Sequence, residues 1–169
     1  AETARFAQNA LEERGVEVIL SDGISRFSGN KVILNSNREL EFDIVIMAIG
    51  VRPEINLAKE AGLETNRGIV TDEFMRTSDK DIFAGCDSVE VLDFVSADST
   101  LIPLAGPANR QGRIIADNIC SVKSSYKKTQ GTSVIKVFDL TIASVGNSEK
   151  QLKSKNIPYW KTYIYGRSH

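Results

Sequence analysis

The stretch KDIFAGCDSVEV, residues 80–91, places Gly85, Cys86 and Asp87 directly after a short apolar run. Small residues at the end of a strand allow a ligand to approach the backbone closely, and a carboxylate there can accept a hydrogen bond from a hydroxyl group. The competing role for Asp87 is that of a helix or turn cap. The rest of the chain decides between a ligand site and a local structural role.

The composition is that of an ordinary globular protein. Of the 169 residues, 41% are hydrophobic and 25% are charged, which is enough apolar material to form a core. No apolar run approaches the roughly 20 residues of a membrane span, and no basic and apolar leader opens the chain. We therefore expect a cytoplasmic protein with no membrane partner.

The two cysteines, Cys86 and Cys120, lie in unrelated contexts without CxxC or metal-ligand spacing. The only histidine is His169, the last residue, so a histidine-based metal site cannot be assembled from this chain. The sequence therefore predicts neither a disulfide framework nor a metal site.

Charge is unevenly distributed along the chain. Residues 1–121 contain 12 Lys and Arg and 20 Asp and Glu, a net charge of −8, whereas residues 122–169 contain 9 and 2, a net charge of +7. The basic part can pack against an acidic surface of its own chain or of a twin subunit, or it can bind the phosphates of a nucleotide or coenzyme. Nucleic acid is not favoured as a partner, because the lysines are scattered and form no dense basic run.

The first 50 residues predict one helix followed by strands. ETARFAQNALEERG, residues 2–15, has helical apolar spacing and ends at a glycine, and VEVIL, residues 16–20, reads as a strand. Residues 23–50 predict short strands broken at the turn-forming SGN and NSN. The last of them, DIVIMAIG at residues 43–50, is apolar nearly throughout and is typical of a strand buried on both faces.

The remaining residues predict further short elements. A short helix closed by Gly62 is followed by two strands within residues 67–85, a hairpin-like pair within 89–104 and a helix over 105–120. A polar segment at residues 121–131 suggests a domain boundary. After it we expect strands over residues 133–146, a short helix at 148–156 and a strand at 158–166.

Four segments in order resemble a known family. DIVIMAIGVRPE, TSDKDIFAGCDSVEV, PLAGPANRQGRIIADNI and GTSVIKVFDLTIASVGNSEKQLK closely resemble the flavin-dependent pyridine nucleotide-disulfide oxidoreductases. The match is best to the branch of the coenzyme A disulfide reductases and the NADH oxidases and peroxidases, and it covers essentially the whole chain. Members of this family are well over twice as long and open with two GxGxxG fingerprints and a redox cysteine. Neither fingerprint occurs here, so the resemblance implies a C-terminal portion.

The resemblance implies an α/β fold: part of a flavoprotein with two dinucleotide-binding domains, present as Rossmann-like half domains, followed by the start of an α+β interface domain. Residues 1–48 would be the C-terminal half of the NAD(P)-binding domain, 49–121 the C-terminal part of the FAD-binding domain, and 122–169 the start of the domain through which such enzymes dimerise. The complete protein would use FAD and NAD(P)H and would form a homodimer.

The resemblance also assigns cofactor contacts. Gly50 lets the backbone pass close to a ring system, although a glycine can also simply end a strand. Asp87 corresponds to the carboxylate that accepts a hydrogen bond from a ribityl hydroxyl of FAD, while the family glycine before it is replaced by Cys86. Pro103, Leu104 and Ala105 correspond to the segment at the pyrimidine edge of the flavin, where the alternative is close helix–sheet packing. No catalytic residue is matched.

Two functions follow from these observations. In the first, the chain is a fragment of an oxidoreductase and is inactive by itself. The parent enzyme passes electrons from NAD(P)H through FAD to a cysteine and on to a small disulfide, a peroxide or oxygen. In the second, the chain is a non-enzymatic assembly module with a vestigial flavin half-site. The residues that select the terminal acceptor, and NADH over NADPH, would lie outside these 169 residues.

Overall fold

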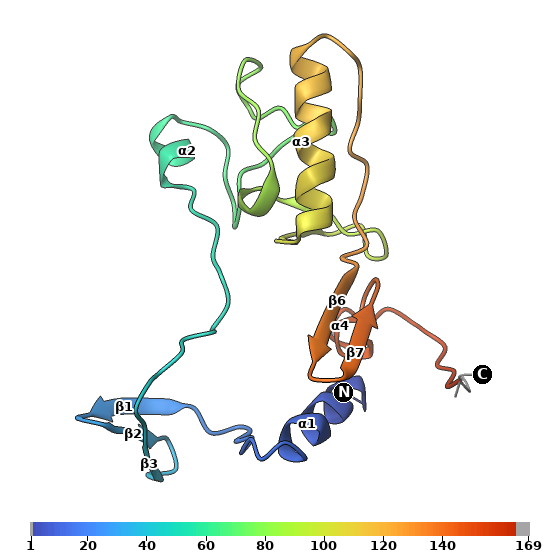
Figure 1. Cartoon of the computed structure of the whole chain (residues 1–169). Helices are drawn as coiled ribbons and strands as arrows, with labels where there is room; N and C mark the ends of the chain where they lie inside the picture. Colours follow the sequence, from blue (N-terminus) through green and yellow to red (C-terminus); the bar gives the residue numbers. More distant parts are fainter. Residues whose placement is uncertain (1, 165–169) are drawn as a thin grey trace. The chain divides into compact units, whose positions relative to one another are not determined.

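The computed structural model describes residues 2–164, and the chain forms two compact units. The first unit comprises Glu2–Arg52 together with Lys136–Leu140. The second unit comprises Pro53–Ile135 together with the residues from Thr141 onward. Figure 1 shows the elements of both units along the chain.

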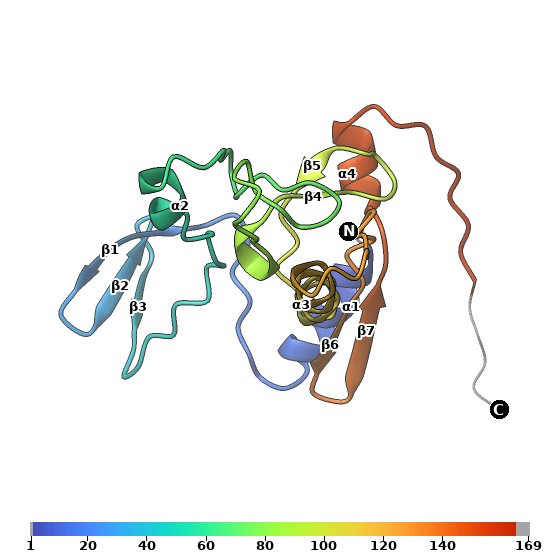
Figure 2. The same ribbon diagram turned by 90° about the horizontal axis from the view of Figure 1, so that it is seen from above.

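The first unit contains one helix and a small antiparallel sheet. Helix α1 covers Glu2–Glu12, and strands β1 (Ile24–Ser28), β2 (Lys31–Leu34) and β3 (Glu39–Glu41) pair in the order β1-β2-β3. Figures 1 and 2 both show these strands side by side. The turns between them lie at the predicted SGN and NSN, where Gly29 and Asn37 have φ angles of 58° and 67°. The predicted helix and the predicted strand breaks are therefore confirmed.

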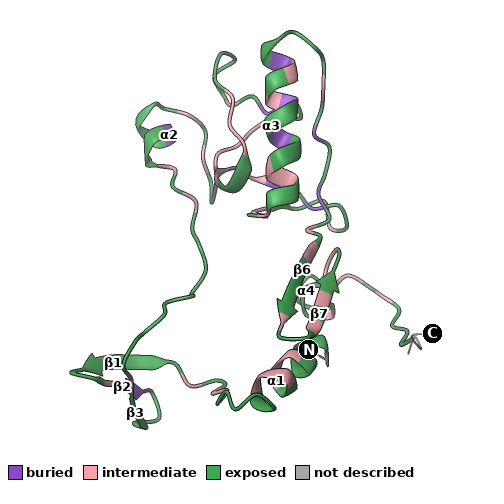
Figure 3. Cartoon of the chain, in the orientation of Figure 1, coloured by how far each residue is buried: buried purple, intermediate pink, exposed green. Residues whose placement is uncertain are grey.

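Two predicted strands of the first unit are absent. Residues 16–20 and residues 43–50 have no regular secondary structure, although both are rich in branched apolar side chains. Ile44, Ile46 and Ile49 are 82%, 85% and 84% exposed, and the segment is drawn as exposed in Figure 3. The prediction of a strand buried on both faces was wrong for this chain, because a strand needs hydrogen-bonding neighbours and no described segment pairs with residues 43–50.

The second unit is organised around helix α3, which covers Ala105–Ile119. It also contains the short helix α2 (Asn56–Glu60), the single 3-10 turn η1 (Cys86–Ser88) and the antiparallel strand pair β4 (Val91–Leu92) and β5 (Ser99–Thr100). The predicted hairpin is thus confirmed, as is the short helix closed by Gly62, whose φ angle is 74°. The two strands predicted within residues 67–85 form only isolated bridges.

The core of the second unit lies on one side of α3. Met75, Val89, Val91, Ile114 and Tyr126 form a buried cluster. Figure 3 shows buried positions recurring along one side of the helix, at the spacing expected for a helix packed on one face. Of the apolar residues that predicted this face, Ile114 is 5% exposed, whereas Ile119 is 62% exposed and lies outside the core.

Residues 133–154 form a hairpin and a helix. Strands β6 (Ser133–Val137) and β7 (Leu140–Ser144) pair with each other, and helix α4 (Glu149–Ser154) follows. A capping box starts α4: the Ser148 side chain accepts from the Gln151 backbone N–H, and the Gln151 side chain accepts from the Ser148 backbone N–H. The strand predicted at residues 158–166 is absent over 158–164, and its last two residues lie outside the described chain.

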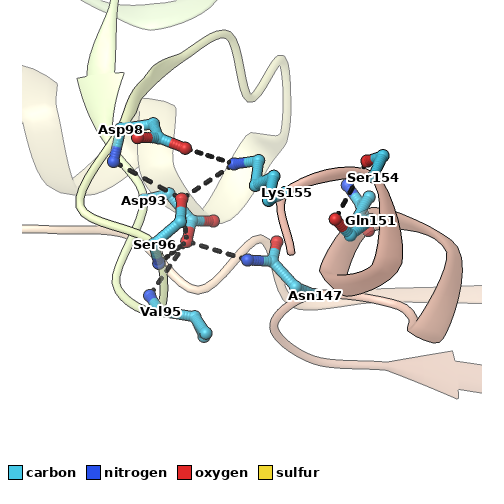
Figure 4. A network of polar contacts seen from close by, with 8 residues as sticks. All are labelled: Asp93, Val95, Ser96, Asp98, Asn147, Gln151, Ser154 and Lys155. Carbon is cyan, nitrogen blue, oxygen red and sulfur yellow. Dashed lines mark hydrogen bonds and ion pairs between the residues drawn. The ribbon is translucent and has the colours of Figure 1, made fainter. Parts of the chain in front are cut away.

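A buried carboxylate holds the loop after β4 to the segment before α4 (Figure 4). Asp93 is 5% exposed, and its Oδ1 accepts from the backbone N–H groups of Val95 at 2.9 Å and Ser96 at 2.7 Å and from Asn147 Nδ2 at 3.1 Å. Burial raises the pKa of Asp93, but these hydrogen bonds outweigh it and hold the pKa below its ordinary value of 3.8.

Lys155, directly after α4, links the other end of this helix to the same loop after β4. Its Nζ lies 2.7 Å from Asp98 Oδ2 and donates to Ser96 Oγ at 2.8 Å. Asp98 belongs to the acidic part of the sequence and Lys155 to the basic part. One of the predicted roles of the basic segment, packing against an acidic surface of the same chain, is therefore realised at this position.

We predict that Asp93→Ala lowers the free energy of unfolding by about 1–3 kcal/mol, because the backbone N–H groups of Val95 and Ser96, the Ser96 hydroxyl and the Asn147 amide lose their buried acceptor. Asp93→Asn retains an oxygen acceptor and costs less. Since folding lowers the pKa of Asp93, its ionic contribution is complete above the ordinary value of 3.8 and is lost as the pH falls through the lower folded value. Urea unfolding from about pH 6 down to about pH 3 measures both effects.

Asp81→Ala is the control for that experiment. Among the described residues the Asp81 side chain pairs only with the adjacent Lys80 on the surface, so its loss changes stability by less than about 0.5 kcal/mol. Equal losses for the Asp93 and Asp81 variants would contradict the role of the buried carboxylate.

Candidate functional site

The predicted contact residue Asp87 lies in η1, which packs beside the first half of α3. The backbone N–H of Cys86 donates to Gln111 Oε1 at 2.7 Å, and Cys86 Sγ lies 3.9 Å from the carbonyl oxygen of Ala108. Asp87 itself is exposed. Within residues 2–164 its carboxylate accepts no hydrogen bond and forms no ion pair, so it does not cap a helix or turn and is available to a ligand.

The second predicted contact, Pro103, Leu104 and Ala105, forms the start of α3. Leu104 is the N-cap residue and provides no side-chain cap, and Pro107 in the first turn has no N–H to donate. The backbone N–H groups of Ala105 and Gly106 find no acceptor in the described part of the chain. A helix start carries about half a positive charge, so these free donors favour an electron-rich group.

The structure brings two of the three predicted contacts together. Asp87 and the start of α3 belong to the second unit and are connected through the contact of Cys86 with Ala108. Gly50 belongs to the first unit. Its φ angle of 90° is one that glycine adopts readily, and a Cβ there would meet no atom within 4 Å. The role of Gly50 toward a cofactor stays a prediction.

A cavity of about 560 Å³ adjoins the start of α3. Gly106, Pro107 and Arg110 line it from the helix, and residues 128–132 line it from the segment that leads into β6. Arg110 and Lys128 have no ion-pair partner among residues 2–164, so the cavity is positively charged. Sequence reasoning missed Arg110. The signal available was its position one turn after Gly106 and Pro107, on the same side of a helix.

These hydrogen-bonding groups, an acceptor at Asp87 and donors at the start of α3, therefore fit a flavin. An exposed carboxylate without a partner suits a ligand hydroxyl, and uncapped backbone N–H groups suit the carbonyl edge of a ring that becomes electron-rich on reduction. The carboxylate of Asp87 and the backbone N–H groups at the start of α3 belong to the same unit. No group of His, Cys, Asp and Glu within residues 2–164 is arranged to hold a metal ion.

The carboxylates with shifted pKa values elsewhere serve structural contacts. Burial raises the pKa of Glu90. Hydrogen bonds from the Ser99 side chain and from the backbone of Arg67 and Gly68 outweigh this effect, so the pKa lies below its ordinary value. Hydrogen bonds from Lys153, Tyr159 and Lys161 lower the pKa of Glu149 to about 2. None of these groups belongs to η1 or to α3.

Within the described residues no helix is both long and apolar enough to cross a membrane.

Comparison with known proteins identifies the family. The pyridine nucleotide-disulphide oxidoreductase family matches residues 1–112. The chain belongs to this family. The NADH oxidase of Methanocaldococcus jannaschii is 35% identical over 159 residues, an alignment that covers 92% of this chain and 36% of the relative. The chain spans between 20% and 39% of the length of the curated relatives compared with it.

Solved structures agree with the sequence relatives. Reduced Bacillus anthracis CoADR-RHD is similar with a TM-score of 0.90 and 46% identity, over 93% of this chain and 29% of that one. An NAD-dependent persulfide reductase from A. fulgidus has a TM-score of 0.90 and 34% identity, over 93% and 30%. An FAD-dependent family member from Desulfovibrio vulgaris has a TM-score of 0.85 and 34% identity, over 89% and 40%. The predicted family and the mixed α/β fold class are confirmed.

We predict that Cys86→Gly raises the free energy of unfolding by up to about 1 kcal/mol. Cys86 has a φ angle of 66°, in the left-handed region that glycine occupies without a steric penalty, and the backbone N–H bonded to Gln111 is kept. Cys120→Gly is the matched control. Its φ angle of −83° suits any residue, so glycine there only adds freedom to the unfolded chain and lowers stability. Denaturant unfolding in which both variants lose stability equally would contradict the prediction.

Proposed function

We propose that this chain is the C-terminal portion of an FAD- and NAD(P)H-dependent oxidoreductase. The complete protein would carry electrons from the nicotinamide through FAD to a redox cysteine and on to a small disulfide, a peroxide or oxygen. One observation carries the proposal: in a chain of this family, the Asp87 carboxylate has no partner among residues 2–164 and lies in a turn packed beside an uncapped helix start.

FAD, when bound, would supply the electron store between the nicotinamide and the acceptor. Asp87 would accept a hydrogen bond from a ribityl hydroxyl and so fix the position of the cofactor. The backbone N–H groups at the start of α3 would stabilise negative charge at the pyrimidine edge, which favours the reduced state. Arg110 and Lys128 beside this helix start would add to the positive potential.

The domain assignment belongs to the same proposal. Residues 1–48 would complete an NAD(P)-binding domain, 49–121 an FAD-binding domain, and 122–169 would begin the interface domain of a cytoplasmic homodimer. Exposed Val134 and Ile135 on β6, together with the basic character of residues 122–169, support an assembly role for this last segment.

We predict that Asp87→Ala in the full-length protein weakens FAD binding about tenfold to a hundredfold. The reason is that a charge-assisted hydrogen bond contributes about 1.5–3 kcal/mol. The dissociation constant is measured by titrating apoprotein with FAD and following the flavin fluorescence. Asp81→Ala, which removes an exposed carboxylate from the same stretch, is the control and should bind as the wild type does. Equal affinity for the two variants would remove Asp87 from the site.

We also predict that the 169-residue chain alone, supplied with free FAD, does not oxidise NADH or NADPH. It contains no GxGxxG fingerprint to hold either dinucleotide in the manner of this family. Steady loss of absorbance at the nicotinamide band would contradict this prediction. Absence of flavin from the full-length protein would instead favour the assembly module with a vestigial half-site.

A further inference from the structure

A buried amide on α3 holds the turn that carries Asp87. Gln111 is 1% exposed, and its Oε1 accepts the backbone N–H of Cys86 at 2.7 Å. The neighbouring Gly85 approaches the same helix so closely that a Cβ on it would lie 2.8 Å from Ile115 Cδ1 and 3.7 Å from Gln111 Cβ. The turn is therefore fixed to α3 at two successive residues, once by a hydrogen bond and once by close packing.

The hydrogen bond acts on a residue whose backbone conformation is unfavourable. Cys86 has a φ angle of 66°, and this left-handed conformation is sterically unfavourable for a residue other than glycine. Such a conformation persists only where the surroundings hold it in place. The Cys86 side chain is exposed, and its only polar contact among the described residues is the long one to the Ala108 carbonyl. The amide of Gln111 thus bonds the backbone of Cys86 itself, while the end of η1 is held separately by the Ile69 N–H, which donates to the Ser88 carbonyl at 2.8 Å.

We propose that Gln111 is a positioning residue for flavin binding, because it fixes the turn of Gly85, Cys86 and Asp87 to α3. Asp87 and the start of α3 then keep one relative position before any ligand arrives. This inference rests on the proposed function, since it concerns the same two flavin contacts. Gln111 does not touch the ligand itself and acts through the Cys86 backbone.

Preorganisation explains why this hydrogen bond affects affinity. A ligand that must order a loose turn loses part of its binding free energy to that ordering, whereas a turn already fixed to the helix costs nothing further. Without the acceptor on Gln111, the Cys86 N–H would be left unbonded against the helix and the turn would relax toward a more favourable φ angle. Asp87 would move with it, because it is the next residue.

The test uses the isosteric variant Gln111→Met, which keeps the volume of the side chain and removes the acceptor. In the full-length protein we expect the dissociation constant for FAD to rise about tenfold. Asn118→Leu is the matched control. Asn118 is a second buried amide on α3, and it donates to the carbonyls of Phe74 and Ser124, far along the helix from η1. The Asn118→Leu variant should have lower thermal stability and unchanged FAD affinity at temperatures well below unfolding.

A second measurement does not involve the flavin. Amide hydrogen exchange on the 169-residue chain reports the Cys86 N–H directly. We expect a protected amide in the wild type and in Asn118→Leu, and exchange at least about tenfold faster in Gln111→Met. Unchanged Cys86 exchange in Gln111→Met, or equal loss of FAD affinity in both variants, would overturn the inference. If the full-length wild type binds no FAD, the proposed function fails, and the exchange measurement still decides whether Gln111 holds the turn.

Discussion

The second unit depends on the one-sided burial of α3. Gln111, Ile114 and Asn118 recur at helical spacing, and all three are less than a tenth exposed. Ile114 supplies the apolar contact with the core, while the two amides satisfy backbone groups of the segments that the helix covers: Gln111 at Cys86, and Asn118 at Phe74 and Ser124. These segments have little regular structure of their own, so buried side chains supply the hydrogen bonds that a wider sheet would otherwise supply.

Polar groups also join the far end of this unit. Asp93 accepts several donors on one oxygen, and Asn147 is one of them, so the loop after β4 and the segment before α4 share a single acceptor. Because the carboxylate is buried, its contribution to the free energy of unfolding depends on every donor being in place. The surface pair of Lys155 and Asp98 adds little by comparison, since exposed ion pairs typically contribute less than 1 kcal/mol.

Sequence reasoning succeeded where the signal is local. Gly15 and Gly62 follow helices, Gly29 and Asn37 form turns, and each requires only its own backbone conformation to be recognised. It failed at residues 16–20 and 43–50, because apolar composition shows that a segment favours burial but not whether a neighbouring strand is available to pair with it. The strand expected near residue 160 failed for the same reason: Trp160 is fully exposed and pairs with nothing described.

The candidate site shows the same difference between what local sequence predicts and what depends on tertiary contacts. Asp87 and residues 103–105 are predicted from the resemblance to the family, and their role toward a cofactor stays a prediction. The sequence does not distinguish Gln111 from Asn118, since both are amides within one buried helical stripe. Only the tertiary contact separates them. It also explains how a cysteine is accepted at position 86: the position supplies a backbone N–H and a left-handed turn, and its side chain is exposed. The described structure therefore uses the backbone of residue 86, whose N–H bonds to Gln111 Oε1 in a left-handed turn.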